Sequence, residues 1–207
     1  YKAVPKINLN SIKLAAELIN NAKKPLIVWG QGVILGNAET ELIKFVEKSG
    51  IPAAWTILGA SAIPTSHPLN VGMLGMHGNY APNILTNECD VLIAIGMRFD
   101  DRVTGDVNRY AKQAKIIHFE IDPAEVNKNI EVDVSVLGDA KQTLNEILKI
   151  DLYPPIIIIK SKNLKSFFLV HSSYTGIKIN SKKKSRKDLH QMPSNFKQFD
   201  NNHNEYV

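Results

Sequence analysis

The chain has 207 residues, of which 44% are hydrophobic and 22% are charged, a composition typical of soluble globular proteins. No apolar run is long enough to cross a bilayer, the N-terminus lacks a signal-peptide pattern, and the single cysteine, Cys89, excludes a disulfide framework and a cysteine-based zinc site. We therefore expect one domain with an appendage, in the cytoplasm or in a plastid or mitochondrial matrix, with no membrane partner.

The net charge of +5 comes from the C-terminal part of the chain. Residues 151–207 hold 10 of the 25 basic groups but only 4 of the 20 acidic groups, so residues 1–150 carry 15 basic and 16 acidic groups. The run Lys182–Lys187 and its Asn/Ser-rich surroundings predict a low-complexity, disordered basic tail at 151–207. A nucleic-acid patch is the alternative there, but we expect no nucleic-acid partner.

The first elements are a helix and a strand. Residues 11–22 predict an amphipathic helix with Ser11 as its N-cap, within a lead-in segment 1–23. Residues 26–29 predict a buried strand that ends at Gly30-Gln31-Gly32. Glycines let backbone N–H groups approach a phosphate closely. No third glycine completes the dinucleotide fingerprint, so an ordinary strand–helix turn remains the alternative.

The next segments continue the alternation. Residues 38–49 predict a helix that ends at Gly50, and residues 52–56 predict a short strand. Residues 71–78 contain three glycines and two methionines, a poor pattern for a strand or a helix. They suit close backbone contact with a flat ligand, or alternatively a loop packed on the core. Residues 82–88 predict another helix.

A strand followed at once by charges is the strongest single signal. Residues 91–95 form an apolar run typical of a strand buried on both faces, and Gly96 ends it. Four charged residues follow: Arg98, Asp100, Asp101 and Arg102. Ligands in open α/β sheets bind beyond the carboxyl ends of strands, and arginine forks suit phosphate or carboxylate, with the aspartates holding the arginines. A solvated turn is the alternative.

The remaining elements complete the predicted sheet. Residues 115–122 predict a strand that ends in acid, residues 132–137 predict a last strand followed by Gly138-Asp139, and residues 140–149 predict a closing helix. Alternating strands and helices predict an α/β fold: a three-layer, Rossmann-like parallel sheet. Four candidate ligand loops would then share one edge: Gly30–Gly32, Gly96–Arg102, Glu120–Asp122 and Gly138–Asp139.

Four motifs of residues 24–148 together resemble one family. They are Gly-Met-Leu-Gly-Met-His-Gly at 72–78, Arg-Phe-Asp-Asp-Arg-Val-Thr-Gly at 98–105, Ile-Asp-Pro-Ala-Glu at 121–125, and Gly-Asp at 138–139. In this order and spacing they resemble the central domain of acetohydroxyacid synthase (acetolactate synthase) catalytic subunits, which are thiamine-diphosphate enzymes that also bind FAD. The resemblance implies that residues 24–150 are an FAD-binding central domain.

The resemblance also implies the site residues. Met76, Asp101 and Arg102 match the family's substrate channel, and Arg102 is the candidate for a 2-keto-acid carboxylate. Gln31 replaces a usual glycine, and Glu120 replaces a more common aspartate of the same charge. The residues matching the FAD site are Gly30, Gly32, Thr56, Leu58, Gly75, Met76, His77, Gly78, Gly96, Arg98, Asp100, Glu120, Ile121, Gly138 and Asp139.

The family's chemistry belongs to thiamine diphosphate, whose ylid attacks pyruvate before a second 2-keto acid is added. The flavin performs no net redox chemistry. The family's catalytic carboxylate and Mg²⁺ ligands match nothing in this chain, since Gly105-Asp106 lacks the second glycine of the metal–diphosphate motif. The resemblance implies a homo-oligomer with a small regulatory subunit.

The sequence leaves three other interpretations open. They are the central domain of another thiamine-diphosphate enzyme binding ADP, an NAD-binding oxidoreductase domain, and a non-catalytic structural module. The chain does not begin with Met and departs from the family after Leu148. We interpret it as a fragment whose tail reflects a truncation or a reading-frame shift.

Overall fold

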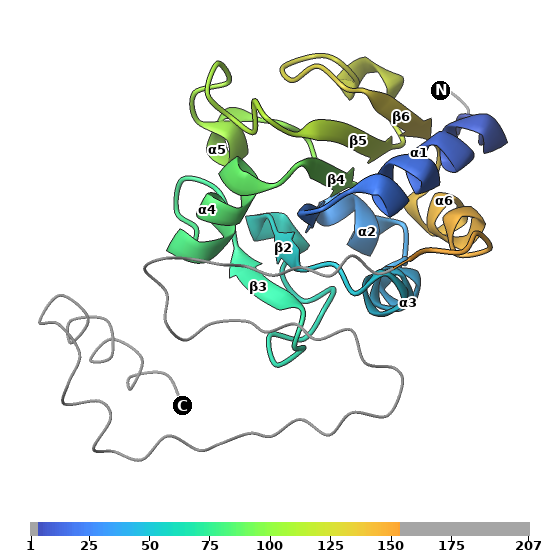
Figure 1. The fold of residues 1–207 in the computed structure, drawn as a ribbon, viewed down its shortest axis with the longest axis horizontal. Coiled ribbons are helices and arrows are strands. Elements are labelled where there is room, and N and C mark those ends of the chain that lie inside the picture. Colours follow the sequence, from blue (N-terminus) through green and yellow to red (C-terminus); the bar gives the residue numbers. More distant parts are fainter. Residues whose placement is uncertain (1–3, 154–207) are drawn as a thin grey trace, which may run out of the picture. The chain divides into compact units, whose positions relative to one another are not determined.

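The computed structural model describes residues 4–153. The predicted disordered tail, residues 151–207, lies outside this part from residue 154 onward. A six-stranded sheet, with every pair of neighbouring strands parallel, runs through the domain in the order β3-β2-β1-β4-β5-β6 (Figure 1). Its strands are β1 (Pro25–Trp29), β2 (Ala53–Trp55), β3 (Asn70–Met73), β4 (Val91–Ile95), β5 (Lys115–Glu120) and β6 (Val134–Leu137).

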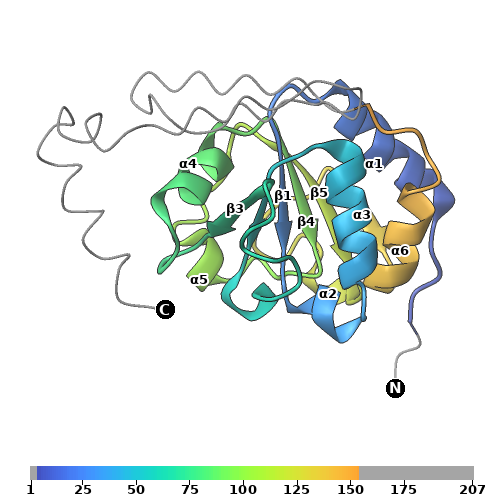
Figure 2. The same ribbon diagram turned by 90° about the horizontal axis from the view of Figure 1, so that it is seen from below.

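Helices cover both faces of the sheet, which confirms the predicted three-layer α/β fold (Figure 2). The α-helices are α1 (Leu9–Asn21), α2 (Gln31–Leu35), α3 (Glu39–Ser49), α4 (Tyr80–Glu88), α5 (Asp101–Thr104) and α6 (Ala140–Ile147), with short 3-10 helices η1 (Ile57–Gly59) and η2 (Pro123–Glu125). Helices α1, α2, α3 and α6 cover what we call the first face, and α4 and α5 cover the second face.

Burial explains the strand signals. All five residues of β1 and of β4 are buried, because both strands lie in the interior of the sheet with helices above and below. Continuous apolar runs are what such strands require. The predicted strands at 26–29 and 91–95 are therefore confirmed, and so is the left-handed cap Gly50, with φ of 64°.

Two sequence predictions were wrong in detail, and two short helices were missed. Helix α1 begins at Leu9, because the side chain of Asn8, not of Ser11, accepts the capping hydrogen bond, from the Asn10 N–H at 2.9 Å. Residues 70–73 do form a strand, β3, at the edge of the sheet, where Gly72 adopts a φ of +101°. The short helices α2 and α5 were not predicted.

Candidate functional site

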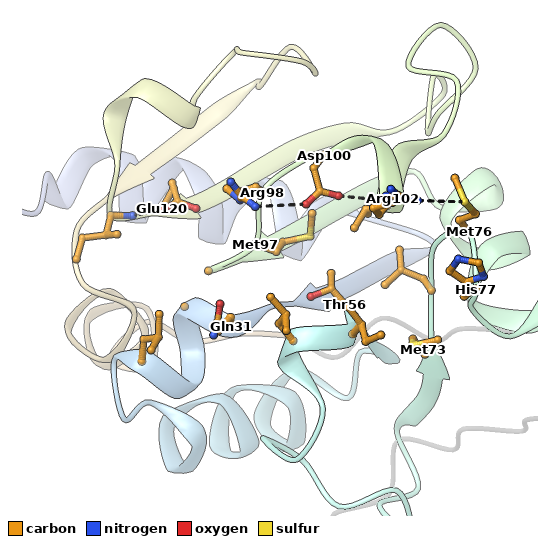
Figure 3. A pocket seen from close by; sticks show the side chains of 18 residues that line it. Gln31, Thr56, Met73, Met76, His77, Met97, Arg98, Asp100, Arg102 and Glu120 are labelled. Atoms are coloured by element: carbon orange, nitrogen blue, oxygen red, sulfur yellow. Dashed lines mark hydrogen bonds and ion pairs between the residues drawn. The ribbon is translucent and has the colours of Figure 1, made fainter.

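An elongated pocket of about 560 Å³ opens at the carboxyl ends of the central strands. The register aligns Trp29 with Ile95 and Ile95 with Phe119, so the segments after β1, β4 and β5 meet at one edge. Figure 3 shows Glu120 toward one end of the pocket, Met76 and His77 toward the other, and the Arg98–Arg102 segment along one wall.

The pocket gathers most of the predicted site residues. Those that line it are Gly32, Thr56, Leu58, Met76, His77, Gly96, Arg98, Asp100, Arg102, Glu120 and Ile121. Those that do not line it are Gly30, Gly75, Gly78, Asp101, Gly138 and Asp139. The expectation that the four strand-end loops share one edge is confirmed, since the strands that precede them are parallel neighbours.

The floor of the pocket is main chain. The Gly32 N–H donates to the Gly96 carbonyl at 2.8 Å, and the Gly30 N–H donates to the Ile95 carbonyl at 3.0 Å. A Cβ on Gly32 would lie 2.7 Å from the Gly96 Cα, and Gly96 has a φ of +56°. Only glycines allow the two backbones to cross this closely. Gly30 therefore supports the floor without facing the cavity.

Arg98 offers its guanidinium to the pocket almost unpaired. Its Nη2 lies 3.7 Å from the Asp100 Oδ2, and the Arg98 side chain is 63% exposed. Asp100 is the N-cap of α5, because its Oδ1 accepts from the Val103 N–H at 3.3 Å. Asp100 therefore fixes the turn and holds Arg98 only loosely, which leaves most guanidinium donors available to an anionic ligand.

Met76 and Arg102 face each other across one end of the pocket. The Met76 N–H donates to the Arg102 carbonyl at 2.8 Å, and a Cβ on Gly75 would lie 2.6 Å from that carbonyl oxygen, so only glycine fits there. The Arg102 Nη1 lies 4.0 Å from the Met76 sulfur. Asp101 Oδ2 lies 4.0 Å from the Arg102 Nε but does not line the cavity.

Glu120 is mostly committed to the protein itself. Its Oε1 accepts from the Ile121 and Asp122 N–H groups at 2.9 and 3.2 Å, and its Oε2 lies 3.5 Å from the His118 Nε2. Only 8% of the residue is exposed, at the pocket wall. The carboxylate fixes the turn after β5, and a ribose contact there stays a prediction.

Gly138 and Asp139 lie at the correct edge but serve the fold. The Gly138 N–H donates to the Glu120 carbonyl at 3.0 Å. Asp139 caps α6, since its Oδ1 accepts from the Gln142 N–H at 3.1 Å. Gly138 and Asp139 therefore lie at the same edge of the sheet as the cavity but do not line it.

Part of the apolar rim of the pocket was not predicted. Seven further residues line the pocket: Gln31, Met73, Leu74 and Met97 fall within the predicted ligand segments but were not named as site residues, whereas Leu35, Ile57 and Val103 lie outside these segments. Leu35, Ile57, Leu58, Met76 and Ile121 are 45–72% exposed, and clustered exposed apolar side chains are typical of ligand sites. Apolar residues shortly after predicted strands were the available signal.

Residues 4–153 contain neither a cluster of metal ligands nor a helix that could span a membrane. No group of three or more His, Cys, Asp or Glu side chains is placed to hold a metal ion there. Within the same described stretch, no helix combines the length and hydropathy that crossing a bilayer requires.

The family described as "Thiamine pyrophosphate enzyme, central domain" matches residues 12–147, which include all six strands of the described sheet and the whole pocket. The chain belongs to this family. The resemblance drawn from the four motifs is thereby confirmed, together with the fold that it implied.

Three relatives of this central domain are named acetolactate synthase large subunits, one of them as probable. The chain is 50% identical over 137 residues to a "Probable acetolactate synthase large subunit" of Methanocaldococcus jannaschii, covering 66% of this chain and 23% of that protein. It is 46% identical over 149 residues to the acetolactate synthase large subunit of Corynebacterium glutamicum, covering 72% and 24%. The chain is 39% identical over 150 residues to the acetolactate synthase large subunit of Buchnera aphidicola, covering 72% of this chain and 26% of that protein. The chain thus spans about a quarter of the length of these relatives.

Proposed function

We propose that the chain is the FAD-binding central domain of an acetolactate synthase large subunit. One observation carries the proposal: ten of the fifteen residues expected to bind FAD line a single pocket at the carboxyl edge of the sheet. The names of the relatives support the parent enzyme.

The pocket suits a long ligand that is anionic in part and flat in part. The glycine floor lets a ligand reach the main chain, Arg98 and Arg102 provide charged donors for a diphosphate or a carboxylate, and the apolar rim suits an aromatic ring system. Glu120 is the candidate acceptor for ribose hydroxyls. In this proposal FAD supplies structure and no net redox chemistry, so the chain needs no hydride-transfer residue.

The chemistry of the whole enzyme is part of the same proposal. The intact protein condenses pyruvate with a second 2-keto acid, with loss of carbon dioxide, in branched-chain amino-acid biosynthesis. Thiamine diphosphate and Mg²⁺ bind elsewhere in the intact enzyme. A homo-oligomer with a small regulatory subunit, in the cytoplasm or an organelle matrix, completes the proposal, and the words "large subunit" in the relatives' names support such a partner.

Equilibrium titration of the purified chain with FAD, ADP and NAD tests the proposal. We expect FAD to bind tightest, because it alone fills both the charged wall and the apolar rim. Tighter binding of ADP would support the central domain of another thiamine-diphosphate enzyme. Tighter binding of NAD would overturn the proposal.

Replacing Arg98 with Ala sharpens this test. Losing a charge-assisted contact costs roughly 1.5–3 kcal/mol, or about ten- to a hundredfold in FAD affinity. Arg109→Ala is the matched control, because Arg109 is exposed and lies outside the pocket lining. Equal affinities for the two variants would contradict the role given to Arg98.

The purified chain is expected to form no acetolactate, even with added thiamine diphosphate, Mg²⁺ and FAD. Deleting residues 160–207 is expected to leave FAD affinity unchanged. Measurable turnover would refute the assignment of catalysis to other parts of the enzyme, and lost FAD binding in the truncated chain would give the tail a binding role.

A further inference from the structure

We propose that His118 is a positioning residue that joins two walls of the pocket, a role that rests on the proposed FAD site. It lies on β5, with its neighbours Ala94 on β4 and Ser135 on β6. The side chain is fully buried and stands edge-on to Phe99, with ring centroids 5.0 Å apart.

The Nε2 atom of His118 contacts both walls. It lies 2.9 Å from the carbonyl oxygen of Met97, which follows β4, and 3.5 Å from the Oε2 of Glu120, which ends β5. Both Met97 and Glu120 line the pocket, whereas His118 does not. The imidazole therefore acts on the pocket through these two residues.

The partners fix the tautomer. A carbonyl and a carboxylate only accept hydrogen bonds, so Nε2 must carry the proton. The Nδ1 of His118 is buried without any partner. A lone pair at that atom is less costly than an orphaned N–H, which favours the same tautomer. The Nε2–H is thus donated to the Met97 carbonyl at 2.9 Å, and the Glu120 carboxylate lies 3.5 Å from the same nitrogen.

A purely space-filling role does not account for this imidazole. The second face around it is apolar, and a leucine would fill such a site without burying an unpaired nitrogen. The contact that a leucine could not make is the Nε2–H donation. Without it, the Met97 carbonyl loses its hydrogen-bond donor, the Glu120 Oε2 loses a polar neighbour at 3.5 Å, and Arg98, the next residue after Met97, loses its fixed anchor.

Two variants separate positioning from packing. His118→Gln places an amide nitrogen near the original Nε2, whereas His118→Leu keeps the volume and removes the donor. FAD titration is expected to show about a tenfold loss of affinity for His118→Leu, corresponding to one lost hydrogen bond, and a much smaller loss for His118→Gln. In a Glu120→Gln background, the effect of His118→Leu should shrink, because the two residues share one interaction.

Nuclear magnetic resonance provides a readout that needs no ligand. Imidazole nitrogen shifts of the wild-type chain should place the proton on Nε2. The Glu120 carboxylate and Met97 amide signals should move in His118→Leu and stay near their wild-type positions in His118→Gln. This measurement also covers the case in which His118→Leu fails to fold, because the tautomer and the His118→Gln spectrum then decide.

Specific outcomes would overturn the positioning role. They are a proton on Nδ1, a folded His118→Leu variant with unchanged FAD affinity, or a folded His118→Gln variant as weak as His118→Leu. Absence of FAD binding to the wild-type chain would instead contradict the proposed function, and the resonance measurements would then judge His118 alone.

Discussion

The two faces of the sheet differ in the atoms that they bury. On the first face, β1, β4 and β5 present apolar side chains to the helices: Ile27, Trp29, Ile93, Ile95, Ile117 and Phe119. On the second face, the same three strands present Leu26, Val28, Leu92, Ala94 and Ile116, but β5 adds His118 and Glu120. Both of these polar side chains are buried.

This contrast separates burial that stabilises the fold from burial that positions groups at the pocket. A closed apolar face stabilises the sheet through area removed from water. The second face bears polar groups next to the pocket, where hydrogen bonds and not area fix the geometry. Substitutions of the buried apolar side chains should therefore change stability, whereas substitutions of His118 and Glu120 should change binding.

The largest expected effect comes from the first face. Phe45 in α3 is fully buried, and Phe45→Ala should lower the free energy of unfolding by about 3–5 kcal/mol, measured by urea denaturation. Leu14→Ala is the control, because Leu14 is 53% exposed and its loss should cost less than about 0.5 kcal/mol. Similar losses of unfolding free energy for both variants would contradict the assignment of Phe45 to the core and of Leu14 to the surface.

The next effect concerns the floor of the pocket. Gly96→Ala should lower the free energy of unfolding by about 1–2 kcal/mol for the left-handed backbone, plus about 1–3 kcal/mol for the clash with Gly32. Gly105→Ala is the comparison for backbone strain without a clash, since Gly105 has a φ of +58° and a ψ of −117° and nothing lies within 4 Å of an added Cβ. Urea denaturation measures both variants, and a loss below about 1 kcal/mol for Gly96→Ala would mean that the crossing is not tight.

The second face should also show its own pH dependence. Burial, and secondarily the charge of Asp90, raise the pKa of the Cys89 thiol from 9.0 to about 12. The unfolded chain therefore releases this proton first, so stability falls as the pH rises above the unfolded pKa. The loss from Cys89 should reach about 1.4 kcal/mol by pH 10. Urea denaturation at several pH values should show this component in the wild type and not in Cys89→Ala. Parallel profiles for the two chains would contradict it.

The smallest expected effect is that of Arg98 on stability. Its ion pair with Asp100 is exposed and 3.7 Å long, so Arg98→Ala should change the free energy of unfolding by less than about 0.5 kcal/mol. Thermal denaturation of the ligand-free variant measures this. A loss above 1 kcal/mol would show that Arg98 supports the fold, and any weakening of FAD binding could then no longer be assigned to a direct contact.

Much of the fold was predictable, because strands in the interior of a parallel sheet have continuous apolar runs that can be recognised in the sequence. The runs at 26–29 and 91–95 are apolar since both faces are covered. Strand β3 at 70–73 was missed, since an edge strand that is only half-buried needs no such run and tolerates Gly72. Helices α2 and α5 are too short to show a 3.6-residue period.

The site was predictable in position more than in contacts. Parallel strands bring their ends to one edge, so the loops after them could be gathered from sequence alone. The role of His118 could not be predicted from the sequence, because its partner Met97 lies 21 positions away in the chain. One histidine in an apolar strand does not reveal which acceptor it contacts. That Asp139 caps a helix was likewise hidden, since a strand-end acid can serve either purpose.

The glycine crossing beneath the pocket has a consequence for how such a domain can change over generations. Main chain presents the same N–H and carbonyl groups whatever residues surround it, and Gly32 and Gly96 leave no room there for a side chain that could vary. The floor is thus fixed by geometry, while the rim residues Leu35, Ile57 and Leu58 are exposed, so that changes there meet no steric clash in the fold. Changes of the rim residues can therefore alter which elongated ligand fits without altering the sheet that supports the pocket.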